Sequence, residues 1–228
     1  MSYAVIPPDQ VTIPVEGGDE LFPVRRIYCV GRNYAEHARE MGFDPDREPP
    51  FFFMKPADAI QPDGAAIPYP PMTENFHYEV ELVIAVGKGG KDISVENALS
   101  HVFGYAVGID LTRRDVQIEA RKMGRPWDMG KGFDKSAPCG PIRRATGIAV
   151  DKGKIWLKVN GDTKQTSDLS KLIWSVPEVI AYLSTYVELA PGDLIYTGTP
   201  EGVGPIVPGD EIIGHVDGVG DISMTVTP

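Results

Sequence analysis

Two carboxylates, Glu79 and Glu81, stand on alternate positions of the strand-like segment NFHYEVEL, which runs from Asn75 to Leu82. Alternate side chains of a strand point to one face, so the two acids converge, with Cα atoms roughly 6.6 Å apart. Like charges at that separation need a cation, a proton or open water between them. Two interpretations are open at this point: a solvated outer face of an antiparallel strand, or part of a metal site.

A third carboxylate, Asp110, ends the apolar run VFGYAVGID. Thr112 and Asp115 have the spacing of a helix capping box, which leaves Asp110 free to act as a ligand. Together with Glu79 and Glu81 it would offer only oxygen atoms, a set that selects a hard cation such as Mg²⁺, Mn²⁺ or Ca²⁺ over zinc. An octahedral ion held in this way keeps positions open for a substrate that chelates through two oxygens.

A histidine and a carboxylate, His37 and Glu40, lie three residues apart on a short helix expected over about residues 33–41. A carboxylate beside an imidazole orients the ring, which suits a general base that takes a proton from water. A surface ion pair is the competing interpretation. Arg32 precedes this helix and Lys55 follows it in the segment FFFMKP.

Two glycine-rich segments carry further polar side chains. Lys131 stands between glycines in DMGKGFD, where the small neighbours permit close approach of backbone and ligand. The spacing around this lysine does not match a P-loop, so nucleotide binding is not predicted. The segment YTGTPEGVG carries Thr197 and Thr199, and it is either a tight strand connection or a binding loop.

The composition is that of an ordinary soluble globular protein, with 228 residues, of which 42% are hydrophobic and 24% charged. A net charge of -10 argues against nucleic-acid or anionic-membrane partners, because either would be repelled at long range. The two cysteines have no zinc or disulfide spacing. No targeting segment or membrane-length apolar run is evident, which predicts a cytoplasmic location.

The elements that must position these residues are mostly short strands. VELVIAV and GYAVGID read as buried strands, KIWLKVNGDTKQTS as a hairpin turning at Asn160-Gly161, and SVPEVIAYLSTY as an amphipathic helix. The lack of regular strand–helix alternation argues against Rossmann and TIM architectures. We therefore expect a strand-dominated α+β fold, with residues 1–20 as an N-terminal arm or peripheral strand and residues 21–228 as the domain that carries the candidate catalytic residues.

Eight segments, in order along the chain, closely resemble the fumarylacetoacetate hydrolase superfamily, and in particular its acylpyruvase and fumarylpyruvate hydrolase branch. They are CVGRNYAEHAREMG, PFFFMKP, NFHYEVELVIAVG, GYAVGIDLTRRDVQ, RPWDMGKGFD, LKVNG, APGDLIYTGTPEGVGP and PGDEI. The resemblance covers nearly all of residues 20–228. It implies a mixed, partly rolled β-sandwich, a homodimer, and Mg²⁺ or Mn²⁺ as the metal.

The resemblance also implies a role for individual positions. The metal carboxylates fall on Glu79, Glu81 and Asp110. The His–Glu dyad, on a helix that serves as a mobile lid, falls on His37 and Glu40. The active-site lysine falls on Lys131, and the residues that hold the carboxylate end of the substrate fall on Arg32, Gln117 and Thr199.

The reaction implied by the resemblance is metal-dependent hydrolysis of the C–C bond of a 3-acylpyruvate, most plausibly a small dicarboxylic keto acid, fumarylpyruvate, giving fumarate and pyruvate. Decarboxylation of oxaloacetate is an alternative that needs the same chelated 2-oxo acid. A tautomerase or isomerase acting on a hydroxymuconate-type diacid is another. Outside enzymes, a non-catalytic keto-acid-binding protein would have lost one of the expected side chains, yet all of them are present.

Overall fold

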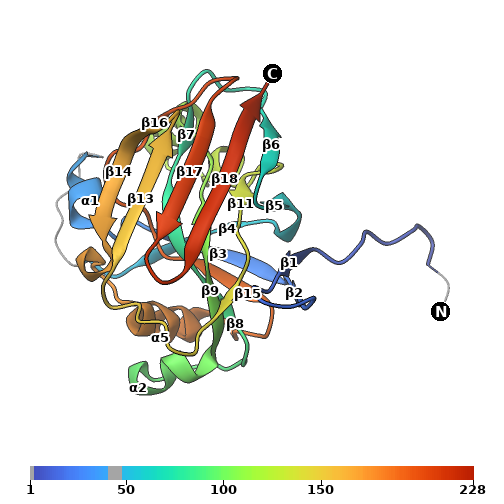
Figure 1. The fold of residues 1–228 in the computed structure, drawn as a ribbon, viewed down its shortest axis with the longest axis vertical. Coiled ribbons are helices and arrows are strands. Elements are labelled where there is room, and N and C mark those ends of the chain that lie inside the picture. The colour runs from blue at the N-terminus through green and yellow to red at the C-terminus, as the bar shows by residue number, and fades with distance from the viewer. Residues whose placement is uncertain (1–2, 41–47) are drawn as a thin grey trace.

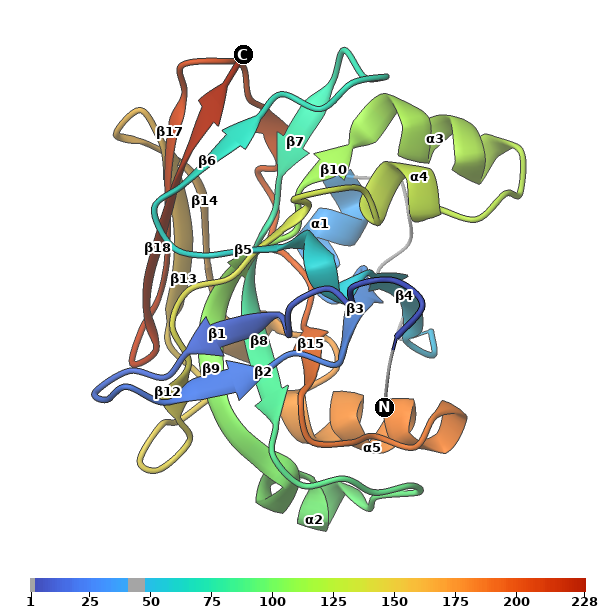
Figure 2. The ribbon, with the colours of Figure 1, turned by 90° about the vertical axis from the view of Figure 1, so that its right-hand side faces the viewer.

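Two β-sheets packed face to face form the body of the protein in a computed structural model that describes residues 3–40 and 48–228. One sheet has six strands in the order β12-β9-β8-β15-β3-β4, and the other has five in the order β14-β13-β17-β18-β6. Figure 1 looks onto the five-stranded sheet, and Figure 2 shows it edge-on beside β8 and β9, with α3, α4 and α5 on the other side. The strand-dominated α+β class predicted above is what this arrangement shows.

The elements have the following bounds. The six-stranded sheet contains β12 (Arg143–Arg144), β9 (Val102–Ile109), β8 (Val80–Val86), β15 (Asp193–Tyr196), β3 (Arg26–Gly31) and β4 (Phe51–Lys55). The five-stranded sheet contains β14 (Asp162–Asp168), β13 (Lys154–Val159), β17 (Glu211–Val216), β18 (Gly220–Thr227) and β6 (Ala65–Pro68). Smaller pairings join β1 (Thr12–Pro14), β2 (Leu21–Pro23), β5 (Ile60–Gln61), β7 (Phe76–Tyr78), β10 (Thr112–Arg113), β11 (Ala137–Pro138) and β16 (Gly204–Pro205). The helices are α1 (Ala35–Glu40), α2 (Val95–Ala98), α3 (Arg114–Lys122), α4 (Asp128–Lys131) and α5 (Val176–Tyr186).

Strand β8 lies at the centre of the molecule and is buried along its whole length. Its sequence, VELVIAV, is nearly continuous in apolar residues because both of its faces are covered. One face, with Leu82 and Ile84, packs in the core between the two sheets. The other, with Val83 and Ala85, belongs to a second core that the N-terminal strands cover.

The hairpin and the long helix predicted from local patterns are both present. Strands β13 and β14 pair antiparallel around Asn160 and Gly161, whose φ angles of 52° and 84° are those of the tight turn that an Asn-Gly pair favours. Helix α5 begins with a capping box in which Ser175 and Glu178 each satisfy a main-chain N–H of the other.

The N-terminal residues are attached to the body through β1, which pairs antiparallel with β2. Ile13 and Val15 are buried in the second core. In Figure 1 the chain before β1 extends away from the body. The β1–β2 hairpin spans residue 20, and the boundary proposed at that position stays a prediction.

The capping box expected at Thr112 and Asp115 is wrong. The Thr112 hydroxyl lies in β10 and donates to the main-chain oxygen of Asp110 at 3.2 Å. The Asp115 carboxylate accepts hydrogen bonds from the Thr73 hydroxyl at 2.5 Å and from the main-chain N–H of Glu74 at 2.9 Å. Asp115 therefore ties down a preceding loop, and Thr112 belongs to the neighbourhood of Asp110.

Both thiols are expected to be inert in the folded protein. Cys29 and Cys139 are buried, and burial raises the pKa of Cys139 to about 12 and that of Cys29 well above its usual range. A disulfide-exchange reagent at pH 8 should react with neither thiol of the native protein and with both of its 2 cysteines in denaturant. Rapid reaction of the folded protein would contradict the packing of the second core.

Candidate active site

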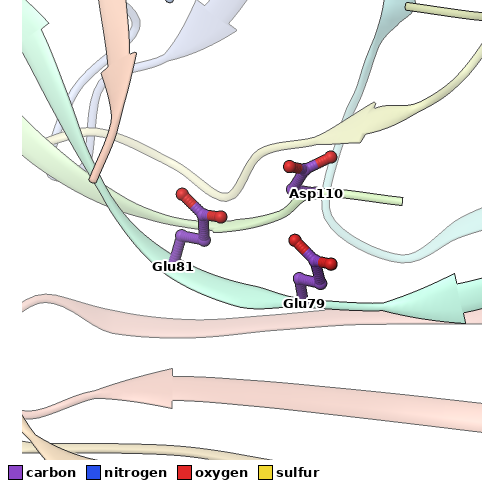
Figure 3. A group of neighbouring side chains, drawn as sticks. All are labelled: Glu79, Glu81 and Asp110. Carbon is purple, nitrogen blue, oxygen red and sulfur yellow. The ribbon is translucent and has the colours of Figure 1, made fainter. Parts of the chain in front are cut away.

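Strands β8 and β9 bring three carboxylates together. Glu79 precedes β8, Glu81 lies within β8 opposite Gly108 of β9, and Asp110 follows β9. One oxygen from each of the three lies within 4.8 Å of the others, and Figure 3 shows the side chains pointing toward one another. Their exposures are 4%, 2% and 0%, so the solvated outer face considered for Glu79 and Glu81 is wrong.

Three buried cations accompany the carboxylates. The Lys131 ammonium donates to Glu79 at 2.8 Å, to Asp110 at 2.7 Å and to the Thr112 hydroxyl at 2.7 Å. The Lys55 ammonium lies 2.8 Å from the other oxygen of Asp110, and Arg114 pairs with Glu79. Buried charges are stable only when they are paired, so Asp110 and Glu79 require these three cations and the cations require the two acids.

Glu81 differs from the other two acids in its partners. Its carboxylate accepts a hydrogen bond from the main-chain N–H of Gly198 at 2.7 Å, and no lysine or arginine of the described ranges forms an ion pair with it. Burial, followed by repulsion from Asp110 and Glu79, raises the pKa of Glu81 well above its usual range. Burial also opposes ionisation of Glu79, but Lys131 and Arg114 hold its pKa below the usual range.

These residues fit a hard divalent cation. The three acids offer oxygen ligands alone, and neither a histidine nor a cysteine joins the group among the residues that the structure describes. A cation beside Glu81 would also stabilise the ionised form of the one acid that lacks a positive partner there.

The predicted dyad lies on α1, which covers most of the helix expected over residues 33–41. The imidazole Nδ1 of His37 lies 3.3 Å from a Glu40 carboxylate oxygen, and His37 is 6% exposed, which excludes the surface ion pair. Glu40 also accepts from the main-chain N–H of Gly202, in the glycine-rich segment. The hydrogen bond from His37 is the main cause that lowers the pKa of Glu40, so its carboxylate stays ionised beside the imidazole. The rest of the proposed lid, residues 41–47, lies outside the described residues.

One pocket contains His37 and the three carboxylates. Arg32, Gln117, Lys131 and Thr199, all expected in the site, line it as well. Thr199 is fixed by Gln165, whose side-chain amide donates to its hydroxyl at 2.8 Å. The other lining residues are Val30, Gly31, Phe51, Phe53, Arg114, Arg121 and Trp127.

Sequence reasoning gave no role to several side chains in and around the pocket. Lys55 ends the apolar strand β4, and its position there was a weak indication of a buried lysine. Arg114 stands one helical turn before Gln117 and donates to its amide oxygen at 2.7 Å. The aromatic residues Phe51 and Phe53 both pack against the ring of Trp127 and form one wall of the pocket.

Comparison with known proteins identifies the family. Residues 26–227 match the model of the fumarylacetoacetate (FAA) hydrolase C-terminal family. The chain belongs to the fumarylacetoacetate hydrolase family. The resemblance found in the sequence is thereby confirmed, and so is the fold that it implied.

Three relatives show the range within the family. A fumarylpyruvate hydrolase from Ralstonia sp. is 52% identical over 185 residues, covering 81% of this chain and 96% of its own. The human oxaloacetate tautomerase FAHD1 is 43% identical over 202 residues, covering 88% of this chain and 90% of its own. The crystal structure of fumarylpyruvate hydrolase from Pseudomonas aeruginosa, in complex with Mn²⁺ and pyruvate, is 54% identical, with a TM-score of 0.97 over 99% of both chains.

Removing Arg114 should destabilise the protein strongly. In Arg114→Met, Glu79 loses one of its two positive partners while remaining buried, and breaking a buried pair costs about 3–5 kcal/mol. Urea unfolding of the metal-free protein should show this loss. Arg125→Met, which changes an exposed residue just beyond α3, is the matched control and should change stability little. Equal stabilities of the two variants would mean that the cluster does not need Arg114.

Proposed function

We propose that this protein hydrolyses the C–C bond of a 3-acylpyruvate in a metal-dependent reaction, with fumarylpyruvate as the substrate and fumarate and pyruvate as products. The observation that carries the proposal is the joint presence in one pocket of an all-oxygen carboxylate cluster and a buried histidine, His37, whose ring lies within hydrogen-bond distance of Glu40. The fumarylpyruvate hydrolases among its relatives support the choice of substrate.

The metal in this proposal is Mg²⁺ or Mn²⁺, held by Glu79, Glu81 and Asp110, with Ca²⁺ as a weaker substitute. When bound, such a cation supplies Lewis acidity to a 2-oxo carboxylate that chelates it. The Mn²⁺ and pyruvate in the Pseudomonas aeruginosa relative support this assignment.

The charge of the pocket favours a dianionic substrate. The three buried carboxylates are balanced by Lys55, Lys131 and Arg114, so a divalent cation would leave two positive charges in excess. Fumarylpyruvate carries two carboxylates, whose charge would offset this excess. A cleft of one sign also concentrates ligands of the opposite sign.

The chain's own side chains carry the remaining steps. His37, oriented by Glu40, takes a proton from a water molecule, and the water oxygen bonds to the distal acyl carbonyl carbon. We assign Lys131 to stabilising the negative charge on the carbonyl oxygen through its own positive charge, because its three N–H donors are directed to Glu79, Asp110 and Thr112. The C–C bond then breaks, its electrons pass to the enolate of pyruvate, and a proton from His37 converts the enolate to pyruvate. The resemblance assigns Arg32, Gln117 and Thr199 to the 2-oxo acid end, and Gln117 and Thr199 keep that role in these steps.

Oxaloacetate chemistry is the second candidate, because the human relative is named an oxaloacetate tautomerase. Decarboxylation or tautomerisation would use the same 2-oxo acid site but would need no attacking water. Isomerisation of a hydroxymuconate-type diacid and non-catalytic keto-acid binding are the remaining alternatives. Parallel assays with fumarylpyruvate, oxaloacetate and acetylpyruvate distinguish them by kcat/KM.

The oligomeric state and the location of the protein are further expectations. We expect a homodimer in the cytoplasm. None of the described helices has the length and apolar character needed to cross a lipid bilayer.

Activity should depend on the metal ligands. Chelation by EDTA should abolish hydrolysis, and Mg²⁺ or Mn²⁺ should restore it. Asp110→Ala should remain inactive at any metal concentration, because it removes a ligand and leaves Lys55 and Lys131 without a shared partner. Full hydrolytic activity after exhaustive chelation would remove the metal from the mechanism.

His37→Ala should affect two reactions unequally. A general base contributes roughly 10²–10⁴-fold, so acylpyruvate hydrolysis should fall by that factor, while any decarboxylation of oxaloacetate should fall much less. Circular dichroism and Mn²⁺ binding should match the wild type. Equal losses in both reactions would show that His37 positions substrate and does not act as the base for water.

A further inference from the structure

One face of α3 runs along the pocket. Arg114, Gln117 and Arg121 follow one another at spacings of three and four residues, so they share a helix face, and all three line the pocket. Arg114 contacts Glu79 at the metal end. Because a helix rises about 1.5 Å per residue, the backbone of Arg121 lies roughly 10 Å farther along the axis than that of Arg114. Figure 2 shows α3 extending from β10 toward the outside of the molecule.

Two arginines, Arg32 and Arg121, line the pocket away from the carboxylate cluster. Arg32 enters it from the end of β3 with its guanidinium over the ring of Phe51, 4.8 Å from the ring centre. Burial lowers the pKa of Arg32, attraction to Glu48 opposes this, and repulsion from Arg121 makes a smaller contribution that also lowers it. Both guanidiniums thus line the same pocket and are close enough to influence each other's charge.

We propose that Arg121, with Arg32 beside it, binds the distal carboxylate of the substrate and so selects dicarboxylic acylpyruvates over monocarboxylic ones. The proposal rests on the proposed function for the identity of the reacting end. It moves Arg32 from the 2-oxo acid end, where the resemblance placed it, to the far end. Guanidinium is the group best suited to a carboxylate, because its parallel N–H donors match the two oxygens.

The length of the substrate agrees with the spacing on α3. Fumarylpyruvate is a chain of seven carbons with a carboxylate at each end, and six bonds of an extended chain span about 7 Å. A 2-oxo acid end at the carboxylate cluster therefore places the other carboxylate near the second turn of α3, within reach of a long arginine side chain. The aromatic wall of Phe51, Phe53 and Trp127 would flank the flat unsaturated segment between the two ends.

A pair of unreactive ligands tests the proposal by binding alone. 2-Oxoheptanedioate and 2-oxoheptanoate have the same length and the same 2-oxo acid end, and they differ in the distal carboxylate. Calorimetric titration of the Mn²⁺-loaded protein should show the diacid binding about 10- to 100-fold more tightly, the usual contribution of a charge-assisted pair. Arg121→Gln should lose most of this preference while binding the monoacid as the wild type does, and Arg121→Lys should keep part of it. Lys122→Gln, an exposed neighbour on α3, is the control and should keep all of it.

Several results would overturn the proposal. They are equal binding of the two acids by the wild type, an undiminished preference in Arg121→Gln, or an equal loss for both acids. A protein that binds neither acid would contradict the proposed function as well.

Steady-state kinetics distinguish a failure of the carboxylate site at Arg121 from a failure of the proposed hydrolase function. Arg121→Gln should raise KM for fumarylpyruvate and change hydrolysis of acetylpyruvate, which has no distal carboxylate, by less than about threefold. If the wild type binds the diacid selectively but hydrolyses neither compound, the proposed hydrolase function is wrong and the proposed carboxylate site is still supported. A wild type that hydrolyses both, with a variant equally impaired on both, would refute the carboxylate site alone.

Discussion

The balance of buried charge around Asp110 and Glu79 is the constraint on which the site depends. Each of these acids is paired with two cations, and Lys131 serves both of them. No member can be removed alone without leaving an uncompensated charge in a site from which water is largely excluded. Glu81 is the exception, because a main-chain N–H is its partner, and it is the acid that gains most from a divalent cation. The same arrangement makes the pocket attractive to a dianion once a metal is bound.

Side chains pack tightly over the strands that carry the acids, at a position where only glycine leaves room for them. Gly108, which pairs with Glu81, has the side chains of Val83 and Tyr196 so near that an added Cβ would lie 2.5 Å and 2.6 Å from their atoms. A side chain at this position would force apart the strands that align Glu81 and Asp110. The rigid β8–β9 pair thus fixes the metal end of the pocket, while the short helix α1 brings His37 to it and α3 extends along it.

Local patterns predicted a large part of this structure. The apolar run of β8, the Asn160-Gly161 hairpin and helix α5 follow from periodicity and turn chemistry, and the family resemblance supplied the residues that the pocket gathers. The wrong and missing predictions concern contacts between segments that are distant in the sequence. Thr112 was expected to cap a helix, but its hydroxyl oxygen accepts a hydrogen bond from Lys131, nineteen positions away. Lys55 and Arg114 were given no role because their acidic partners, Asp110 and Glu79, are far away in the sequence and no local spacing reveals such pairs.

Titration of the metal-free protein with Mn²⁺ tests the central claim most directly, with Glu81→Gln compared against the wild type. Glu81 has no lysine or arginine partner among the described residues, so this substitution removes a ligand without leaving a buried cation unpaired, and urea unfolding can show that the fold is kept. The charge balance described here predicts one Mn²⁺ per chain in the wild type and an affinity at least about tenfold weaker in the variant. Equal affinity in the two proteins, with both folded, would contradict a metal site built on the three carboxylates.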